Sequence, residues 1–409
     1  MGIFSKAFGN VKNETYTLTD TDSWIGLFGG GVTSSGETVT KESAMTISSV
    51  YACTNIIANS VSKLPCHVYK KKKDGNERIN NDIAYLLETR PNQYMTPSTF
   101  KHTLVTKLLL DGNAYVWIEY KIGKILNLWI LNNVTIQQDT VTGKITYQAN
   151  LNNKLYTFSS DEIIHIKGLA TDGITGKSKI DVLRETIGNM QSSRKLMGNY
   201  FKNGTTTGGV ITYPEKMNSN TKNTIRNEWQ KNNAGYENSG KVAILDLGLE
   251  YKEINNIKFA DQQFLESTKF TLEEIARVFQ VPLHMVGDLD RSTFNNIEQQ
   301  SLDFYMNTIL PLLLQIEEEF NYKLFASYQR NQGYYIKYNM EGALRGDSKT
   351  RAEYYEKMMN NGVYSINEVR KLENLNSIGE AGDKYYRSLN YVNVDKMDEY
   401  QLNKAGGGE

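Results

Sequence analysis

The sequence contains few residues of the kinds that bind metal ions or form disulfides. It has 2 cysteines and 4 histidines in 409 residues. Cys53 and Cys66 stand beside apolar residues, so they predict two small core side chains and not a disulfide framework or a zinc site. The histidines are isolated from one another, which gives no ligand spacing for a metal. We therefore expect no metal or other cofactor, and a reducing cytoplasm as the place of assembly.

Long apolar runs are also missing. The longest candidate, at 309–316, is interrupted by Pro311 and Gln315 and is far shorter than the ~18 residues that a membrane helix needs. The N-terminus lacks the basic start and sustained apolar stretch of a signal peptide. Position 6 is Lys6, where a myristoylation motif has Ser or Thr. These absences predict a soluble protein with no membrane partner.

An excess of charge of either sign is absent as well. The chain has 46 basic and 46 acidic residues, for a formal net charge of +0. A protein that binds DNA tightly is normally basic, because phosphate neutralisation supplies most non-specific affinity. A neutral chain is restricted to loose contact with DNA.

The length predicts two or three domains. Residues 1–40 are rich in Gly, Thr and Ser and have little periodicity, so we expect a flexible arm. Gly29, Gly30 and Gly31 do not form a phosphate cradle, because no strand precedes them and no GK[ST] follows.

Residues 41–177 predict an α+β domain. Apolar spacing predicts a helix over 46–64, and Thr96 with Pro97 predicts the start of another that ends at Gly112. A third, short helix is expected over 83–88. Strands with turn signals between them are expected over 66–71, 114–120, 125–130, 134–138, 145–149, 156–158 and 163–167.

Two patterns in this domain have a structural and a functional interpretation. Lys70 to Lys73, beside the hairpin turn Asp74-Gly75, suit a nucleic-acid patch, but lysines at a hairpin tip are usually only solvated, and we favour that interpretation. His165 alternates with isoleucines, which is typical of a hydrogen-bonded core histidine and not of a ligand.

A run of residues 173–178, GITGKS, resembles a nucleotide-binding loop only in part. A P-loop has glycine five places before Gly-Lys-Ser, and here that place is held by Thr171. We therefore expect a turn before the helix that starts near Lys179 and continues to Lys202.

The second half of the chain predicts mainly helices. A helix over 262–280 stops at Val281-Pro282, and a long helix starts with Asn295 as N-cap and Glu298 closing a capping box. It contains Pro311, which predicts a kink near Thr308. Between the helices of 179–202 and 262–280 we expect a small unit with a helix at 219–232 and strands at 210–213, 241–245 and 250–254. A strand at 334–338 and helices after Ser348 and Ser365 complete the chain.

The run EEIARVFQVPLHMVGDLDRSTFNNIEQQSLDFYMNTILPLLLQIEEEFNYKL resembles the portal proteins of tailed bacteriophages, specifically the HK97 family. The runs SVYACTNIIANSVSKLPCHVYK, RPNQYMTPSTF, LLLDGNAYVWI and DEIIHIKG follow the same family pattern, although Asn132-Asn133 stand where many relatives have a proline. The resemblance implies an α+β portal fold that forms a ring, usually of 12 subunits, at one capsid vertex. Double-stranded DNA is packaged and ejected through such a ring.

The resemblance also implies a division of the chain. It predicts an arm (1–40), a wing (41–177), a stem helix (178–204), a clip (205–258), a second stem helix (259–281), a tunnel loop (282–294), a long kinked helix with a return strand (295–343) and a crown with a disordered tail (344–409).

Site residues follow from the same resemblance. The DNA-facing tunnel loop is expected to present His284, Met285, Gly287, Asp288, Asp290, Arg291 and Ser292, with mixed charges that hold DNA weakly. Pro311 marks the helix kink. The clip is expected to dock partners through Lys222, Arg226 and Lys231, although a solvated helix face explains the same charges.

The implied partners are further copies of the chain, double-stranded DNA, the large terminase subunit, the head–tail adaptor, and the major capsid and scaffold proteins. The implied location is the capsid vertex of the virion, after assembly in the cytoplasm of a bacterial host. No ATP site is recognisable, so we expect a non-catalytic conduit.

Three other classes remain open from the residues. A nuclease needs convergent metal ligands, and Asp288 and Asp290 have no third partner at recognisable spacing; a cleavage assay with Mg²⁺ separates this class. A scaffold or minor head protein would form particles without a central hole. A membrane pore is disfavoured by the missing apolar spans.

Overall fold

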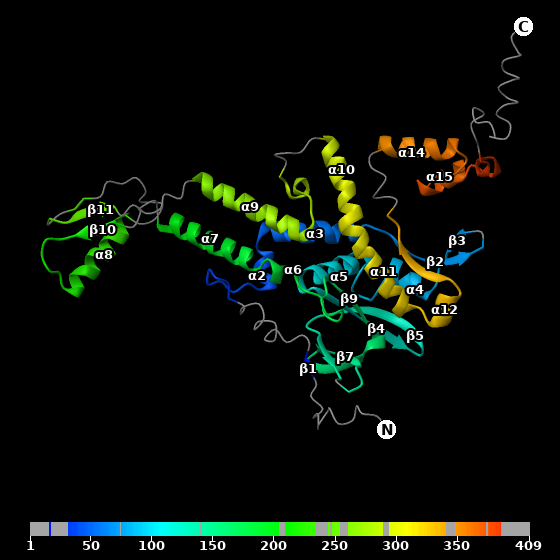
Figure 1. Ribbon diagram of the computed structural model, residues 1–409, viewed down its shortest axis with the longest axis horizontal. Helices are drawn as coiled ribbons and strands as arrows, with labels where there is room; N and C mark the ends of the chain where they lie inside the picture. Colours follow the sequence, from blue (N-terminus) through cyan, green and yellow to red (C-terminus); the bar gives the residue numbers. More distant parts are fainter. Residues whose placement is uncertain are drawn as a thin grey trace, which may run out of the picture. The chain divides into compact units, whose positions relative to one another are not determined.

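The computed structural model describes residues 16–17, 32–73, 75–139, 141–203, 209–233, 244–245, 248–253, 261–288, 294–340, 348–373 and 375–385. The chain divides into two compact units, Met1–Asn339 and Met340–Glu409. Helices and small antiparallel sheets alternate in the first unit, and the second is helical where it is described (Figure 1). None of the described helices is long and apolar enough to cross a membrane.

Helices α3 (Ser48–Ser62) and α5 (Pro97–Asp111) pack against each other and form the helical layer of the first unit. Their apolar stripes are buried, including Val50, Ile57 and Leu104. The Thr96 side chain accepts a hydrogen bond from the Thr99 amide, and Gly112 ends the helix in the left-handed conformation. The predicted start and end of this helix are therefore confirmed. Two short helices, α2 (Lys41–Met45) and α4 (Asp82–Glu88), lie beside this layer.

Three antiparallel sheets complete the main part of this unit. In the first, β4 (Asn113–Lys121) lies between β5 (Lys124–Leu131) and β9 (Ile163–Lys167). The second has the order β1 (Tyr16–Thr17), β6 (Thr135–Gln138), β7 (Ile145–Leu151), β8 (Lys154–Ser159). An apolar cluster that includes Tyr115, Ile136 and Phe158 joins the two sheets. The six strands predicted over 114–167 are all present.

The third sheet joins distant parts of the chain. Its order is β12 (Tyr334–Tyr338), β2 (Cys66–Lys72), β3 (Gly75–Arg78). The return strand has the predicted bounds, and its pairing with β2 was not predictable from local sequence. Cys66 and Cys53 are both buried, and neither forms a disulfide. Burial raises the pKa of each thiol to about 12. They are core residues, as predicted.

His165 lies in the core next to the turn of residues 172–178. Its Nε2 is 2.9 Å from Asn113 Oδ1, its Nδ1 is 3.3 Å from the Tyr147 hydroxyl, and its ring stacks on Tyr115. Desolvation lowers its pKa to about 3, so the ring is neutral. The prediction of a core histidine is confirmed.

The turn of residues 172–178 is a structural connection. Asp172 accepts hydrogen bonds from the Ile174 and Thr175 amides, and Ser178 caps the next helix. Asn113 bonds both the Gly176 amide and its carbonyl oxygen. The backbone amides of this turn therefore face side chains of the protein and do not wrap a phosphate.

The helix predicted over 179–202 is divided in two. Helix α6 (Lys179–Val182) ends at the buried Leu183, and α7 (Arg184–Asn203) follows. The Ser178 cap and the φ of −92° with ψ of 9° at Leu183 tighten this turn, so a single continuous helix was wrong. Thr186 Oγ1 donates to Glu274 of α9 (Asp261–Phe279) over 3.0 Å and joins the two long helices.

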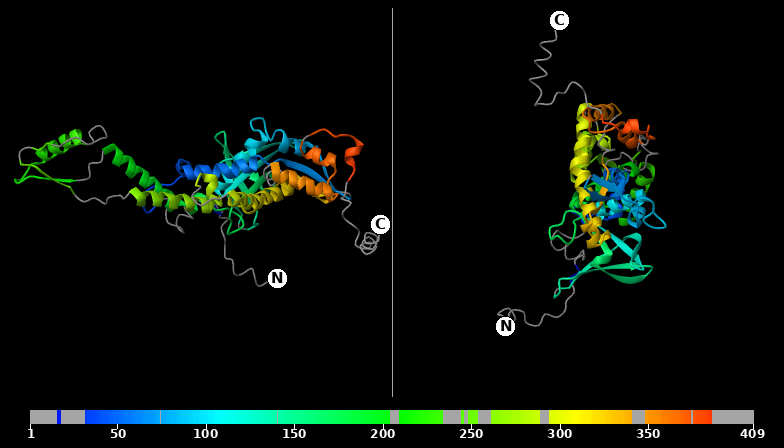
Figure 2. Two further views of the ribbon diagram at one scale, coloured as in Figure 1. Left: turned by 90° about the horizontal axis from the view of Figure 1, so that it is seen from above. Right: turned by 90° about the vertical axis from the view of Figure 1, so that its right-hand side faces the viewer.

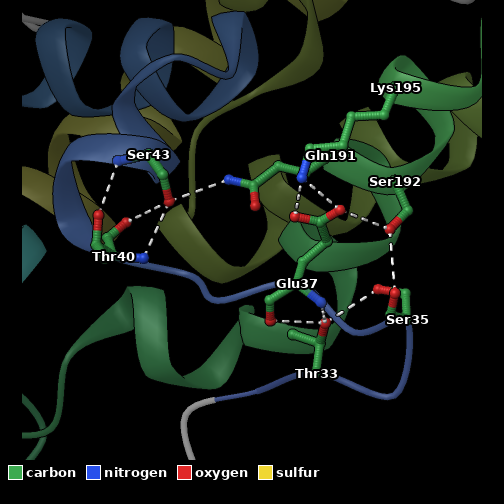
Figure 3. A network of polar contacts seen from close by, with 8 residues as sticks. All are labelled: Thr33, Ser35, Glu37, Thr40, Ser43, Gln191, Ser192 and Lys195. Carbon is green, nitrogen blue, oxygen red and sulfur yellow. Dashed lines mark hydrogen bonds and ion pairs between the residues drawn. The ribbon is translucent and has the colours of Figure 1, made fainter. Parts of the chain in front are cut away.

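The N-terminal arm is shorter than predicted, because residues 32–40 are folded against α7 (Figure 3). Glu37 pairs with Lys195 and accepts a hydrogen bond from Ser192. Thr33 is buried beside Gly188, where an added Cβ would lie 2.5 Å from the Thr33 side chain. A polar segment without periodicity is held by hydrogen bonds, which no hydrophobic pattern reports. The predicted arm residues 1–15 and 18–31 lie outside the described part of the chain.

Between α7 and α9 the described residues form β10 (Gly209–Thr212), α8 (Ser219–Asn233) and β11 (Glu250–Glu253). The two strands pair with each other, and Trp229 of α8 stacks on Tyr251 at 4.9 Å. The strand predicted over 241–245 is wrong at Ile244 and Leu245, which are in no strand; its other residues lie outside the described part.

The long helix consists of α10 (Phe294–Phe304), a π-helical segment (Tyr305–Ile309) and α11 (Leu310–Leu324), followed by α12 (Ser327–Asn331). Figure 2 shows α10 and α11 one after the other, in yellow. The described helix includes Asn295 and begins at Phe294, so the prediction of Asn295 as N-cap is wrong. In the second unit, Ser365 caps α15 (Ile366–Leu372) with Glu368, as predicted, after α14 (Ser348–Asn360).

Candidate functional site

The connection between α9 and α10 carries most of the predicted site residues. Helix α9 ends in a Schellman motif: the Val281 amide bonds the Ala276 carbonyl at 2.9 Å, and Gln280 is left-handed with φ of 59°. Val281 is buried, which fixes the direction of the chain as it leaves the helix. Pro282 then prevents further helix and starts a 3-10 turn, Leu283–Val286.

Gly287 ends this turn with φ of 92°, a conformation that favours glycine. The Asp288 amide bonds the Leu283 carbonyl at 3.1 Å and closes the turn on itself. We call residues 280–288 the α9–α10 loop. The predicted site residues Asp290, Arg291 and Ser292 lie outside the described residues.

Both ring nitrogens of His284 contact side chains of α10. Nδ1 lies 2.9 Å from Gln300 Oε1, and Nε2 lies 3.3 Å from Ser301 Oγ. Both nitrogens are therefore engaged inside the protein. The contact fastens the loop to α10, a role that sequence spacing does not indicate.

Asp288 faces α9. Its carboxylate lies 4.0 Å from Lys269 Nζ, and its side chain is only 13% exposed. The partial burial and the nearby ammonium hold the carboxylate against the protein. Met285 is half-buried in the same turn.

A cavity of about 660 Å³ lies between α9, the loop and α10. Its charged lining residues are Lys269, Glu273, Arg277, Asp288 and Asp303. Three of them, Lys269, Glu273 and Arg277, are spaced four apart, so they share one face of α9. This stripe was not predicted from the sequence, although its i, i+4, i+8 spacing was a usable signal.

The irregular segment before Pro311 is joined to the loop. The regular α-helical hydrogen-bond pattern gives way to π-helix over Tyr305–Ile309, which includes Thr308. Thr308 Oγ1 donates to the Gln280 carbonyl oxygen at 2.8 Å. Thr308, near which a kink was predicted, is thus also where the long helix holds the start of the loop.

The three predicted docking residues of α8 are exposed but do not share one face. Lys222 and Arg226 are one turn apart. Lys231, nine residues after Lys222, lies about half a turn around the helix, at ~100° per residue. A partner that docks on one face of α8 would therefore contact either Lys222 with Arg226, or Lys231. It would not contact all three residues equally.

Within the described residues, no group of three or more His, Cys, Asp or Glu side chains is placed to hold a metal ion. The arrangement around the α9–α10 loop offers a turn fixed at both ends and a cavity of mixed charge.

The sequence and the fold both match those of connector proteins from phage-type particles. The sequence model described as "Phage portal protein" matches residues 48–374, so the chain belongs to the phage portal protein family. Proteins of this family are structural, and the chain is a portal, or connector, of a phage-type head.

The portal protein of Enterobacteria phage HK97 is 29% identical over 365 residues, which cover 88% of this chain and 85% of that protein. A chain from the structure called "Neck of native GTA particle computed with C12 symmetry" has a TM-score of 0.55 and 19% identity, with coverage of 87% and 98%. An HK97 family portal protein from Corynebacterium diphtheriae has a TM-score of 0.54 and 16% identity, with coverage of 75% and 97%. The structural likenesses show that the fold is shared.

Proposed function

We propose that copies of this chain form a closed ring, of 12 subunits, around a channel for double-stranded DNA at one vertex of the virion capsid. In this ring the α9–α10 loop of each subunit faces the channel. The observation that carries the proposal is the loop itself: a short turn held to α9 by a Schellman motif and to α10 by His284. The stated symmetry of the related neck structure supports the number 12.

Exposed apolar residues support a ring. Leu302 and Met306 are 42% and 44% exposed and lie four residues apart on the long helix. Apolar side chains on one face of a helix are usually covered, and a rotated copy of the same chain is the occupant that closes a ring. These residues would lie at the contact between neighbouring subunits.

The remaining partners follow the family. The unit of β10, α8 and β11 would dock the large terminase subunit during packaging and the head–tail adaptor afterwards, through Lys222, Arg226 or Lys231. The sheets formed by β2 to β9 would contact major capsid and scaffold proteins during assembly in the host cytoplasm. Energy would come from the terminase, and the ring itself would catalyse no reaction.

Native mass and top-view images of the purified protein test the ring. We expect a twelvefold multiple of the chain mass and a central hole. Leu302→Glu with Met306→Glu should abolish the ring and leave a folded monomer, whereas Leu155→Glu, at a residue 68% exposed on β8, should leave the ring intact. Particles without a hole, or rings unaffected by the double change, would contradict the proposal.

The channel role of the loop is tested by packaging. Asp288→Ala should change the amount of DNA packaged and retained in heads, because it removes the carboxylate that lies 4.0 Å from Lys269 Nζ and so makes the loop of every subunit more positive. Asp161→Ala, at an exposed aspartate outside the loop, is the matched control. Equal packaging and retention in both variants would remove the loop from the mechanism.

A further inference from the structure

The β2–β3 hairpin concentrates positive charge in a chain that is neutral as a whole. Residues 70–78, KKKKDGNER, contain five basic and two acidic residues, while the chain has 46 of each. This segment, here the β2–β3 ribbon, has no role in the proposed channel. The proposed channel therefore does not account for the charge of the ribbon.

The described residues of the ribbon are exposed from Lys71 onwards. β12 pairs with β2 as far as Lys70, which lies opposite Tyr334, and the Lys71 amide bonds the Gly333 carbonyl just before β12. Beyond that point β2 and β3 form a two-stranded ribbon (Figure 1), and every residue of β3 is exposed. Because side chains alternate along a strand, Lys70 and Lys71 emerge on opposite faces.

Three of the lysines have no neutralising partner in the part of the chain that the structure describes. Lys72 pairs with Glu77 at 2.6 Å, and Arg78 pairs with Glu88. No described carboxylate pairs with Lys70, Lys71 or Lys73. Counted against Asp74, Glu77 and the paired Glu88, the five basic residues of the ribbon leave a net charge of +2.

Tyrosines of β12 orient two of these lysines without neutralising them. Lys70 Nζ lies 4.7 Å from the centre of the Tyr334 ring, and Lys71 Nζ lies 5.7 Å from that of Tyr335. Attraction between an ammonium and a ring face limits the motion of the lysine. Each charge is therefore preorganised for an anion.

We infer that the β2–β3 ribbon binds the phosphate backbone of a nucleic acid without reading its bases. A two-stranded ribbon fits the major groove of a duplex, which is about 12 Å wide, and lysines on both faces then reach phosphates on either side. The ribbon has no apolar side chain to insert into a lipid surface. It also offers Lys and not Arg, which suits point contacts to phosphate rather than bidentate pairing.

This site is separate from the α9–α10 loop. It would hold DNA outside the channel, so its test does not depend on the channel proposal. Binding of added nucleic acid to the assembled protein measures it directly.

The experiment measures the anisotropy of a short labelled duplex with the full-length assembly, from about 50 to about 200 mM salt. Lys70→Gln, Lys71→Gln and Lys73→Gln together should weaken binding about 100-fold near 100 mM salt, and the slope of log K on log salt should become less steep by about 2 to 3. A labelled single strand is the second arm and should bind more weakly than the duplex, since it has no groove.

The matched control removes the same charge elsewhere. Lys121→Gln, Lys144→Gln and Lys154→Gln change three exposed lysines outside the ribbon and should alter affinity and slope little. Equal losses in both triple variants, or no loss in the first, would overturn the inference. Tighter binding of polyglutamate than of either nucleic acid would also overturn it, in favour of an acidic protein partner.

The tyrosine contribution has its own test. Tyr335→Leu should weaken duplex binding about threefold, as expected for an exposed cation–π contact of about 0.5 to 1 kcal/mol. Tyr335→Phe keeps the ring and should bind as the unmodified protein does. Equal binding by the Leu and Phe variants would show that the ring does not orient Lys71.

Discussion

The turn of residues 172–178 and the α9–α10 loop both depend on glycine, but the surroundings of the glycines differ. A Cβ added at Gly176 would lie 2.0 Å from the Gly112 carbonyl oxygen. A Cβ added at Gly287 would have no atom within 4 Å, although its φ is 92°. The first turn is therefore fixed by close contact with α5, and the second by its own backbone and by side chains of α9 and α10.

This difference separates a turn packed tightly against its neighbours from a loop with open space around its glycine. The GITGKS run looks more like a functional motif in sequence, yet its Gly176 bonds Asn113 of β4 and its Ser178 bonds Leu110 of α5. The α9–α10 loop has an unremarkable sequence and open space around its glycine. Space around the backbone, more than glycine content, distinguishes the two.

Gly176→Ala should have the largest effect. The added methyl group must displace backbone atoms of Gly112 and Gly168, so we expect a loss of at least about 3 kcal/mol in the free energy of unfolding. The measurement is chemical unfolding of the assembled protein. Gly173→Ala, at φ of 71° with no atom near the added Cβ, should cost about 1 to 2 kcal/mol; equal losses would refute the close-contact explanation.

Acid should weaken the same turn through His165, which bonds Asn113. Burial lowers its pKa from 6.5 to about 3, so between these values the unfolded chain binds a proton that the folded chain does not. The resulting stability is complete above about pH 6.5 and is lost towards pH 3, by up to about 1.4 kcal/mol per pH unit.

Unfolding curves at a series of pH values check this slope. His165→Gln keeps one donor and one acceptor but does not titrate, so its stability should be lower near neutral pH and should fall less steeply in acid. An unchanged slope in that variant would assign the pH dependence to other groups.

Gly287→Asn should have the smallest effect, below about 1 kcal/mol, because asparagine tolerates positive φ and nothing obstructs its side chain. Gly112→Asn is the matched comparison, at φ of 73° but with Lys177 backbone 2.5 Å from the added Cβ. We expect a loss several times larger there. Similar unfolding free energies for the two variants would remove the distinction between the two glycine sites.

Much of the fold was predictable because it depends on local signals. Thr96 and Ser365 cap helices where expected, and the strands over 114–167 alternate as a sheet requires. The ordered segment at 32–40 was missed because it is produced by contacts with distant residues, which leave no periodic pattern. The break at Leu183 is a local turn between α6 and α7.

The candidate site was predictable in position and not in geometry. Proline and glycine placed the loop after α9, and the family resemblance supplied its expected role. That His284 binds α10, that Asp288 turns towards Lys269, and that Lys269, Glu273 and Arg277 line a cavity are consequences of packing.

By itself the sequence determined the order and type of most elements and the family, because capping, turn residues and apolar spacing act over a few neighbours. The tertiary structure decided which polar groups are already satisfied. It closed the GITGKS run into a structural turn and left the lysines of the β2–β3 ribbon without described acidic partners. Those outcomes depend on residues such as Gly112 and Tyr334, which are far away in the chain and adjacent only after folding.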